Sequence, residues 1–521
     1  MFSKVLRTND IIIHKLFYRY LLRKNQFRSF MVQINDNTGF GNFKRFQDLK
    51  STFLTPKYNE LLSILPIWEA CVFNYNKVYE ARVAPVNKPS EFKELYRKIK
   101  DELKNLNDIE VSILFHFIKT QENKEIGLTA RDFKLRYDNL HNSIRLKHIR
   151  DHAMDSSMTS AIDAASSELY CRPEVFAQSF RFLKYHGYFA TFHAGEDFYD
   201  LADGLRSIDE AIWFLGLEAG DRIGHAIALG LNPIRFYSLR HNYIAIPQQW
   251  MLDNVVWLYC YSRKHNITIS PAAEHFILDT YKLLLWTIGY QQAGSGNIDI
   301  SDYYQSMLLR GDNPNYYKQG VFNKRMRNES ISDSDSWRSF DLQQHKGIDD
   351  IRKYNTVAVR LYSDYHFNMD VRRKGKLIKA YHLPDGYPNL ILELQNKMIQ
   401  EISKCRLGIE CCPSSNFRIG HLEKFENHPI FRFMPVHEPE SRYPLPVTVN
   451  TDDLGIFATS LPNEFSLLAL ALLKKKDDKG NHVYSSQEVY DWIKRVVENG
   501  HKYHFKDDRV QVIQNNEDDD N

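Results

Sequence analysis

The stretch YFATFHAGE, residues 188–196, decides the fold class. Its apolar run Tyr188–Phe192 is typical of a buried β-strand, and the run ends in His193. Glu196 follows after the small residues Ala194 and Gly195. In parallel α/β barrels the side chains at the carboxyl ends of strands line the active-site mouth. We therefore expect one strand of such a barrel, carrying His193 and Glu196 into a site.

Six further β-type runs alternate with helical stretches on both sides of this strand. They span residues 78–83, 111–118, 161–165, 221–224, 407–411 and 446–450. Strands that alternate with helices are typical of βαβ units and a parallel sheet. The sequence therefore predicts an α/β fold, a TIM-like (β/α)8 barrel of which seven strands are visible and the first is missing.

A long segment separates the predicted strands at 221–224 and 407–411. It holds about 180 residues, where a βα unit of a barrel averages about 30. We predict a large, mostly helical insertion after the sixth strand, residues 241–400, over or beside the pocket mouth. The remaining predicted units are an N-terminal helical segment, the two parts of the barrel and a C-terminal tail, residues 1–60, 61–240, 401–490 and 491–521.

Composition and charge exclude several broad classes of protein. Of 521 residues, 43% are hydrophobic, which supports a folded core, and the net charge of +3 gives no overall attraction to nucleic acid. Six scattered cysteines form neither a disulfide framework nor a zinc ribbon. The longest apolar runs are far shorter than the roughly 20 residues that span a bilayer. We expect a cytoplasmic protein without a membrane span or signal peptide.

Three more polar motifs stand where predicted strands end. They are DRIGHA (221–226) with His225, CCPSSN (411–416), and NTDD (450–453) with the paired carboxylates Asp452 and Asp453. Singly, each has an ordinary structural explanation: a hydrogen-bonded histidine, a turn, or a helix cap. Adjacent carboxylates are costly unless a cation or hydrogen bonds compensate them. Together, on separate strand ends, the motifs predict one metal-assisted active site.

HAGE, RIGHA, CPSSN and NTDD, in this order, resemble the adenosine/AMP deaminase family. The resemblance covers roughly residues 40–235 and 400–475. VYEARVAP, residues 78–85, is similar to the second strand of the family. IDAASSE, residues 162–168, is similar to its fourth-strand segment, where the family has Ala-Gly in place of Ala165-Ser166.

The resemblance implies zinc-dependent deamination of an adenosine-type purine. It implies that His193 and Asp452 are Zn²⁺ ligands and that Glu196 donates a proton to the purine ring. By the same resemblance His225 orients or deprotonates the attacking water, and Asp453 hydrogen-bonds the purine or the hydroxide. Ser166 is expected to lie against the substrate, which is a purine nucleoside, a nucleotide, or adenosine in RNA.

The family also has a His-x-His at the end of its first strand, and this chain contains none. One interpretation aligns DIIIHK, residues 10–15, with that strand, so that Ile12 and His14 take the two positions. The other holds that this segment starts an amphipathic helix and that the chain begins after the first strand. We then expect the chain alone to bind zinc weakly and to turn over slowly or not at all, because catalytic zinc needs about three protein ligands.

The insertion and the N-terminal helices also resemble those of deaminase subunits from the bacterial RADAR anti-phage systems. That resemblance implies an ATPase partner, a homo-oligomer and a role in antiviral defence. Two other functions stay open: an inactive barrel that serves as an assembly scaffold, and another metal-dependent amidohydrolase. RNA is a partner to consider because residues 371–376 (VRRKGK) and 474–476 (KKK) are basic, although such runs are usually solvated surface.

Overall fold

A curved sheet of seven parallel strands organises the chain. The computed structural model describes residues 5, 7–8, 10–31, 39–53, 67–73, 77–104, 109–122, 129–152, 159–291, 296–317, 340–420, 422–437 and 445–505. The strand order follows the sequence and every neighbouring pair is parallel. The strands are β1 (Val78–Val83), β2 (Glu110–Ile118), β3 (Thr159–Ala165), β4 (Phe189–Ala194), β5 (Arg222–His225), β8 (Gly408–Cys411) and β9 (Val447–Val449).

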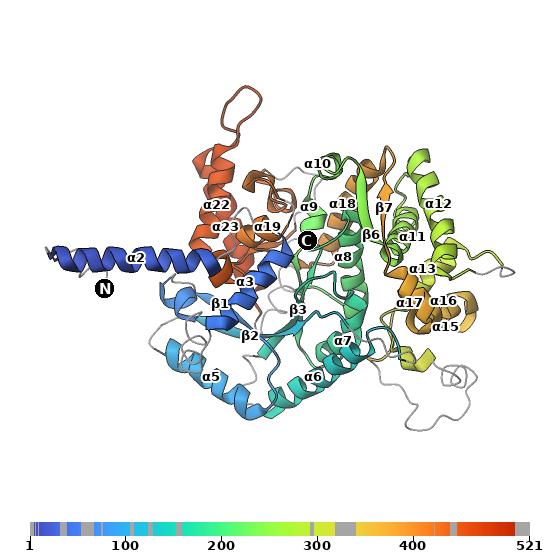
Figure 1. The fold of residues 1–521 in the computed structure, drawn as a ribbon, viewed down its shortest axis with the longest axis horizontal. Coiled ribbons are helices and arrows are strands. Elements are labelled where there is room, and N and C mark those ends of the chain that lie inside the picture. Colours follow the sequence, from blue (N-terminus) through green and yellow to red (C-terminus); the bar gives the residue numbers. More distant parts are fainter. Residues whose placement is uncertain are drawn as a thin grey trace, which may run out of the picture.

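All seven predicted strands are confirmed, and so is the barrel-type fold. β1 and β9 are the two edges of the sheet, and no strand among the described residues joins them. Helices that lie between the strands in the sequence, and two that follow the last strand, cover the convex face (Figure 1). They are α5 (Pro89–Leu103), α6 (Phe133–His152), α7 (Ala177–Tyr185), α8 (Leu201–Leu215), α22 (Leu461–Lys474) and α23 (Ser486–Tyr503).

Local sequence signals explain where these helices begin and end. α5 and α22 have proline in the first turn, where no hydrogen bond is lost, and α8 ends at Gly216 in the left-handed conformation. α23 begins with a capping box of Ser485 and Glu488, and it continues past residue 490. The apolar faces of the helices pack on the sheet, as Trp492 of α23 does with none of its surface exposed.

The concave side of the sheet holds charged residues rather than a purely apolar filling. Arg82 of β1 donates to Asp163 of β3 at 2.7 Å and to Glu410 of β8 at 2.6 Å. Arg222 of β5 lies 2.7 Å from the other oxygen of Glu410. The loss of solvation of each charge is offset by an ion pair with a charge of the opposite sign. The ion pairs join β1, β3, β5 and β8 across the space that the sheet encloses.

The end of the described chain fills the amino-terminal end of this space. Phe505 is fully buried, and its ring stacks on Phe189 and lies under the guanidinium of Arg222 at 3.8 Å. His504 is buried beside Ser112 of β2, 3.4 Å from its hydroxyl. The sequence places the functional residues at the opposite, carboxyl-terminal end of the sheet.

The insertion follows β5, which is the strand predicted as the sixth of the barrel. It is a helical lobe, as predicted, and it also contains two strands. Strands β6 (Tyr243–Pro247) and β7 (Ile378–His382) form a separate antiparallel pair. The lobe lies beside the barrel, with α11 packed on α8 (Figure 1). Its helices, with the short α9 and α10 that precede it, are α9 (Ile227–Gly230), α10 (Pro233–Ser238), α11 (Gln248–Lys264), α12 (Pro271–Ile288), α13 (Ile300–Leu308), α15 (Ile348–Tyr354), α16 (Thr356–Phe367), α17 (Met369–Gly375) and α18 (Tyr387–Lys404).

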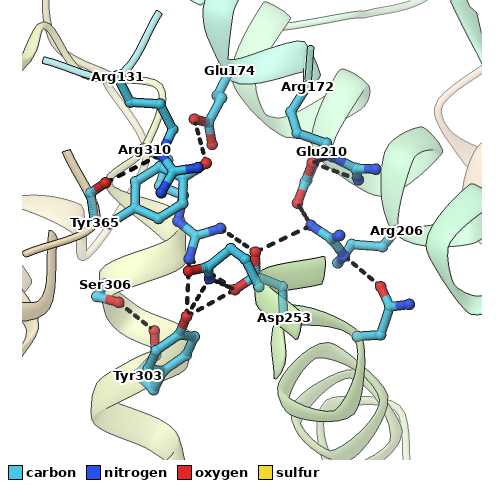
Figure 2. A network of polar contacts seen from close by, with 12 residues as sticks. Arg131, Arg172, Glu174, Arg206, Glu210, Asp253, Tyr303, Ser306, Arg310 and Tyr365 are labelled. Atoms are coloured by element: carbon cyan, nitrogen blue, oxygen red, sulfur yellow. Dashed lines mark hydrogen bonds and ion pairs between the residues drawn. The ribbon is translucent and has the colours of Figure 1, made fainter. Parts of the chain in front are cut away.

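A buried polar network connects the lobe to the barrel (Figure 2). Asp253 of α11 accepts two hydrogen bonds from Arg310 of the lobe, at 2.6 and 2.9 Å. Arg206 of α8 donates a hydrogen bond to Asn254, which follows Asp253 in α11, at 2.9 Å. Tyr365 of α16 donates to Glu174, which follows β3, at 3.0 Å. Asp253 and Arg310 thus pair within the lobe, and the hydrogen bonds of Arg206 and Tyr365 join the lobe to the barrel.

The N-terminal segment is helical, and this overturns one of the two interpretations of residues 10–15. α2 spans Ile11–Met31, projects away from the barrel in Figure 1, and is followed by α3 (Phe40–Phe53). Asp10 accepts a hydrogen bond from the amide of Ile12 at 2.8 Å and so caps the helix. His14 lies within α2, its Nε2 2.9 Å from the carbonyl of Val5. Its placement on a first strand is therefore wrong.

None of the described helices is long and apolar enough to cross a membrane. Residues 318–339 and the residues after 505, which include the end of the predicted C-terminal tail, lie outside the described part of the chain. The remaining elements are η1 (Trp68–Phe73), η3 (Pro173–Phe176), η4 (Pro314–Tyr317), α19 (Pro413–Ile419), η6 (Phe425–Asn427), α20 (Ile430–Phe433) and α21 (Leu454–Phe457).

Candidate active site at the carboxyl ends of the strands

Three of the predicted site residues meet where β4 and β5 end. His193 is the last residue but one of β4, and His225 is the last residue of β5. Their ring centroids are 4.7 Å apart. Glu196 follows β4, and its Oε1 lies 3.2 Å from Nδ1 of His225. All three side chains are buried, so their mutual contacts are made with little competing water.

The orientation of His193 is fixed from two sides. Its Nδ1 lies 3.1 Å from Oδ1 of Asp163 on β3, which accepts the proton on that nitrogen. Gly224 of β5 lies against the ring, and a Cβ at that position would be only 3.1 Å from Nδ1. The lone pair of Nε2 is therefore left available for a ligand. A carboxylate on the far nitrogen is the usual support of a metal-binding histidine.

His116 is a further histidine in this group, on β2. Its ring stacks on that of His193 with centroids 5.6 Å apart, and its Nε2 lies 3.6 Å from Asp163. Burial, the first cause, lowers the pKa of His116 to about 4 despite the opposing charge of Asp163. His116 is therefore neutral at physiological pH.

Asp452 approaches the same site from the end of β9. A ring nitrogen of His225, the thiol of Cys412 and a carboxylate oxygen of Asp452 all lie within 4.8 Å of one another. Ser415 donates to Oδ2 of Asp452 at 2.6 Å, which leaves Oδ1 for another partner. Asp452 is the exposed member of this group, whereas His225 and Cys412 are buried.

Glu196 has the environment of a carboxyl group that stays protonated. Burial is the largest cause that raises its pKa well above the ordinary range, and the negative charge of Asp452 adds to it. The backbone around Glu196 is held by Glu168, which accepts from the amides of Gly195 and Glu196, both at 2.8 Å. A buried, protonated carboxyl group can donate a proton or a hydrogen bond to a bound molecule.

The structure gives Asp453 and Ser166 positions that the sequence motifs do not specify. Oδ1 of Asp453 accepts from the amides of Gly455 and Ile456, both at 3.1 Å, so this side chain caps α21. Ser166 follows β3 with φ = 84°. That conformation favours glycine, which is the residue that the family has at this position.

Strained backbone recurs around the site. His225, Ala226 and Asp452 have φ of 66°, 49° and 55°, and each lies within three residues of a strand end. Non-glycine residues in the left-handed region cost about 1 kcal/mol or more, and they gather at functional sites. Here the unusual backbone turns His225 and Asp452 toward the mouth.

Several supporting residues were not assigned from the sequence. Asp163 and Glu168 lie in the fourth-strand motif, but only contacts across strands reveal that they hold His193 and the loop after β4. His116 could have been found as the one ionisable residue in the otherwise apolar centre of the strand at 111–118. Arg82 and Glu410 carry no local signal, because the 328 residues that separate them hide their contact.

A family model places the last part of this site in a known group. Residues 383–477, which include Ser415, Asp452 and Asp453, match the model described as adenosine deaminase. This segment of the chain is therefore similar to the adenosine deaminase family. His193, Glu196 and His225 lie outside the matched segment.

Relatives of this family match only short parts of the chain. An aminodeoxyfutalosine deaminase from Streptomyces coelicolor is 33% identical over 76 residues, 15% of this chain and 18% of the relative. An adenosine deaminase-like protein from Drosophila pseudoobscura pseudoobscura is 38% identical over 68 residues, 13% of this chain and 18% of the relative. The chain thus spans less than a fifth of the length of these two curated relatives.

The comparison with solved structures gives long but distant alignments. The N6-methyl-AMP deaminase of Arabidopsis thaliana aligns with 92% of this chain and 82% of its own, at 11% identity and a TM-score of 0.41.

The donor groups present at the site fit a metal ion in part. His193 offers Nε2 and Asp452 offers Oδ1, each held by a second partner as metal ligands commonly are. Cys412 is a poor donor because burial raises the pKa of its thiol well above the ordinary value. Asp163 is already paired with Arg82. Two positions therefore fit a cation, and the sequence supplies no His-x-His for the others.

Proposed function

We propose that this chain forms the catalytic mouth of a hydrolytic deaminase that acts on an adenosine-type purine. The observation that carries the proposal is the meeting of His193, Glu196, His225 and Asp452, from three strand ends, in a chain whose residues 383–477 match the adenosine deaminase model. The substrate class includes adenosine, an adenine nucleotide and adenosine in RNA. RNA is the least supported, because Arg372 of the predicted basic cluster is buried.

Each residue takes the role that its environment permits. Glu196, protonated, donates to a ring nitrogen of the purine as water adds to the carbon that bears the amino group. His225 is neutral, since burial lowers its pKa, and it orients the attacking water. Asp453 and Ser166 stay proposed contacts of the purine. Asp453 would contact the purine from the start of α21, whose first amides it caps.

Zinc is the metal we propose, with His193 and Asp452 as its ligands from this chain. A bound zinc ion makes a water molecule acidic near neutral pH, to a pKa of about 7. Asp163 holds the ring of His193 in place, and Ser415 does the same for the carboxylate of Asp452. The proposed role in anti-phage defence with an ATPase partner rests on the resemblance of the insertion alone.

A catalytically inactive scaffold is the second candidate function. Its specific support is the donor count, because two assured positions hold zinc more weakly than the usual three. The strained backbone at His225 and Asp452 weighs against it, since a scaffold has no need of that strain.

A single substitution at Glu196 tests the proposal. Purified wild-type chain, with zinc added, is assayed for conversion of adenosine and AMP to the inosine forms by absorbance, with metal content measured in parallel. Glu196→Gln keeps the shape and removes the proton, so turnover should fall by about 100-fold or more with metal content unchanged. Glu423→Gln, an exposed carboxylate paired with Arg235, is the matched control. Equal turnover in all three proteins would contradict the proposal.

A further inference from the structure

A chain of hydrogen bonds leads from the backbone after α19 to the ring of His225. The amide of Ile430 donates to Nδ1 of His428 at 3.1 Å. Nε2 of His428 lies 3.1 Å from Oδ1 of Asn416, and Nδ2 of Asn416 lies 2.7 Å from Nδ1 of His225. All three side chains are buried. Neither Asn416 nor His428 has a part in the proposed reaction.

The first link settles the protonation of His428. A backbone amide can only donate, so Nδ1 of His428 accepts and carries no proton. A neutral imidazole has its proton on the other nitrogen, so Nε2 is the donor to Asn416. Burial lowers the pKa of His428 to about 3, in agreement with a neutral ring.

The second link settles the orientation of Asn416. Its Oδ1 accepts from the amide of Cys412 at 3.2 Å as well as from His428. If the side-chain amide were rotated by half a turn, its NH₂ group would face two donors, which is unfavourable for a buried polar group. The nitrogen of Asn416 therefore faces His225 and donates to its Nδ1.

We infer that Asn416 and His428 are positioning residues that hold His225 in the tautomer with its proton on Nε2. In this tautomer His225 presents a hydrogen-bond donor from Nε2 and has no lone pair there to accept a proton. Of the two roles that the family resemblance allows, orienting the water and deprotonating it, the geometry points to the first. This choice of role rests on the proposed function, whereas the tautomer does not.

The contact between His225 and Glu196 follows from the same assignment. Nδ1 of His225 is already an acceptor, so it cannot donate to the Glu196 oxygen 3.2 Å away. An ionised Glu196 would place a lone pair against a lone pair. A protonated Glu196 removes this repulsion, and protonated is the state that a proton donor requires.

The tautomer is read directly from the nitrogen spectrum of the full-length chain. Protein labelled with ¹⁵N-histidine is examined by long-range proton–nitrogen correlation, and the His225 signals are identified by their loss in His225→Gln. We expect a protonated, pyrrole-type Nε2 and an unprotonated, pyridine-type Nδ1. A pyrrole-type Nδ1 in the wild-type protein would overturn the inference without any further variant.

Variants separate the two positioning residues. Asn416→Asp keeps the shape but offers His225 only an acceptor, so the two nitrogen types should exchange places. His428→Leu removes one donor that holds Asn416, and a second His225 population with a protonated Nδ1 should appear. His428→Gln can both accept from Ile430 and donate to Asn416, and should restore the single wild-type pattern. Exposed His437→Gln is the control.

Activity provides the independent readout. If His225 acts as a donor, Asn416→Asp should lower kcat about 100-fold and change KM by less than about threefold, as when one aligned donor is lost from an active site. An unchanged tautomer in both Asn416→Asp and His428→Leu would overturn the positioning roles. The expected tautomers together with unchanged turnover in Asn416→Asp would contradict the proposed role of His225 in the reaction and leave the positioning roles standing.

Discussion

Gly224 has no functional group, yet it limits what can be changed beside His193. A methyl group there would meet Cα and Nδ1 of His193, both at 3.1 Å. We predict that Gly224→Ala displaces the His193 ring and costs about 1–3 kcal/mol of unfolding free energy, the usual range for overpacking. Zinc affinity should fall as well, because the ring can no longer hold its bond to Asp163.

Denaturant unfolding and zinc titration of Gly224→Ala measure both effects. Gly500→Ala is the control, since a methyl group at Gly500 meets nothing within 4 Å and the residue lies inside α23. That change should raise helix stability by roughly 0.5–1 kcal/mol. Full zinc affinity in Gly224→Ala would show that the close packing at this position does not determine the orientation of the His193 ring.

At the same scale, the sequence predicted the residues of the site better than their supports. His193, Glu196 and His225 are recognisable because they stand in the short motifs HAGE and RIGHA at the ends of predicted strands. Asp163 and Asn416 stand in equally visible motifs, but their partners lie on other strands. A motif states which residues end a strand, whereas hydrogen-bond partners depend on the register between strands, which a single sequence does not give.

At the scale of elements, the ion pairs inside the sheet make the fold sensitive to acid. Burial opposes ionisation of Glu410, but Arg82 and Arg222 outweigh it and lower its pKa to about 2. A carboxyl group whose pKa is lower in the folded protein than in the unfolded chain stabilises the fold above the unfolded value. This stabilisation should be complete above about pH 4.5 and disappear as the pH falls toward 2.

We predict that Glu410→Gln lowers the unfolding free energy at pH 7 by about 3 kcal/mol, because two buried guanidinium groups each lose a partner. Glu401→Gln is the control. The pKa of Glu401 is also lowered to about 2, but its side chain is exposed and pairs with surface lysines. Its replacement should cost less than about 0.5 kcal/mol. Equal losses in the two variants would show that the interior pairs contribute no more than surface ones.

The strands of the barrel were predictable as elements, and the pair β6–β7 was not. Each barrel strand is a short β-type run that alternates with helical stretches along the sequence. β6 has exposed Tyr243 and Ala245 beside buried Ile244 and Ile246, and its partner β7 is 130 residues farther along. Such a strand is stabilised by its pairing and not by its own composition, so no local pattern indicates it.

For the whole molecule, the network of Figure 2 predicts that lobe and barrel unfold together. Asp253→Ala removes the partner of Arg310 and leaves a buried positive charge near Arg206. We expect a loss of about 3–5 kcal/mol. Hydrogen exchange should increase in α8 of the barrel as well as in α13 of the lobe.

The matched control for this prediction is Arg263→Ala, which breaks an exposed pair with Glu274 on the same lobe. It should leave hydrogen exchange in α8 unchanged. Faster exchange in α13 alone after Asp253→Ala would indicate two units that unfold separately.

The parallel pairing of β5 with β8 also determines the order in which the molecule can form during synthesis. β5 ends at His225 and β8 begins at Gly408, so the ribosome adds about 180 residues between the two partners. At 5–20 residues per second this takes roughly 10 to 40 s. During that time the edge of β5 has no strand to pair with, and such edges are prone to aggregation. The lobe is synthesised over the same interval, so the edge of β5 waits for its partner until the whole lobe has been made.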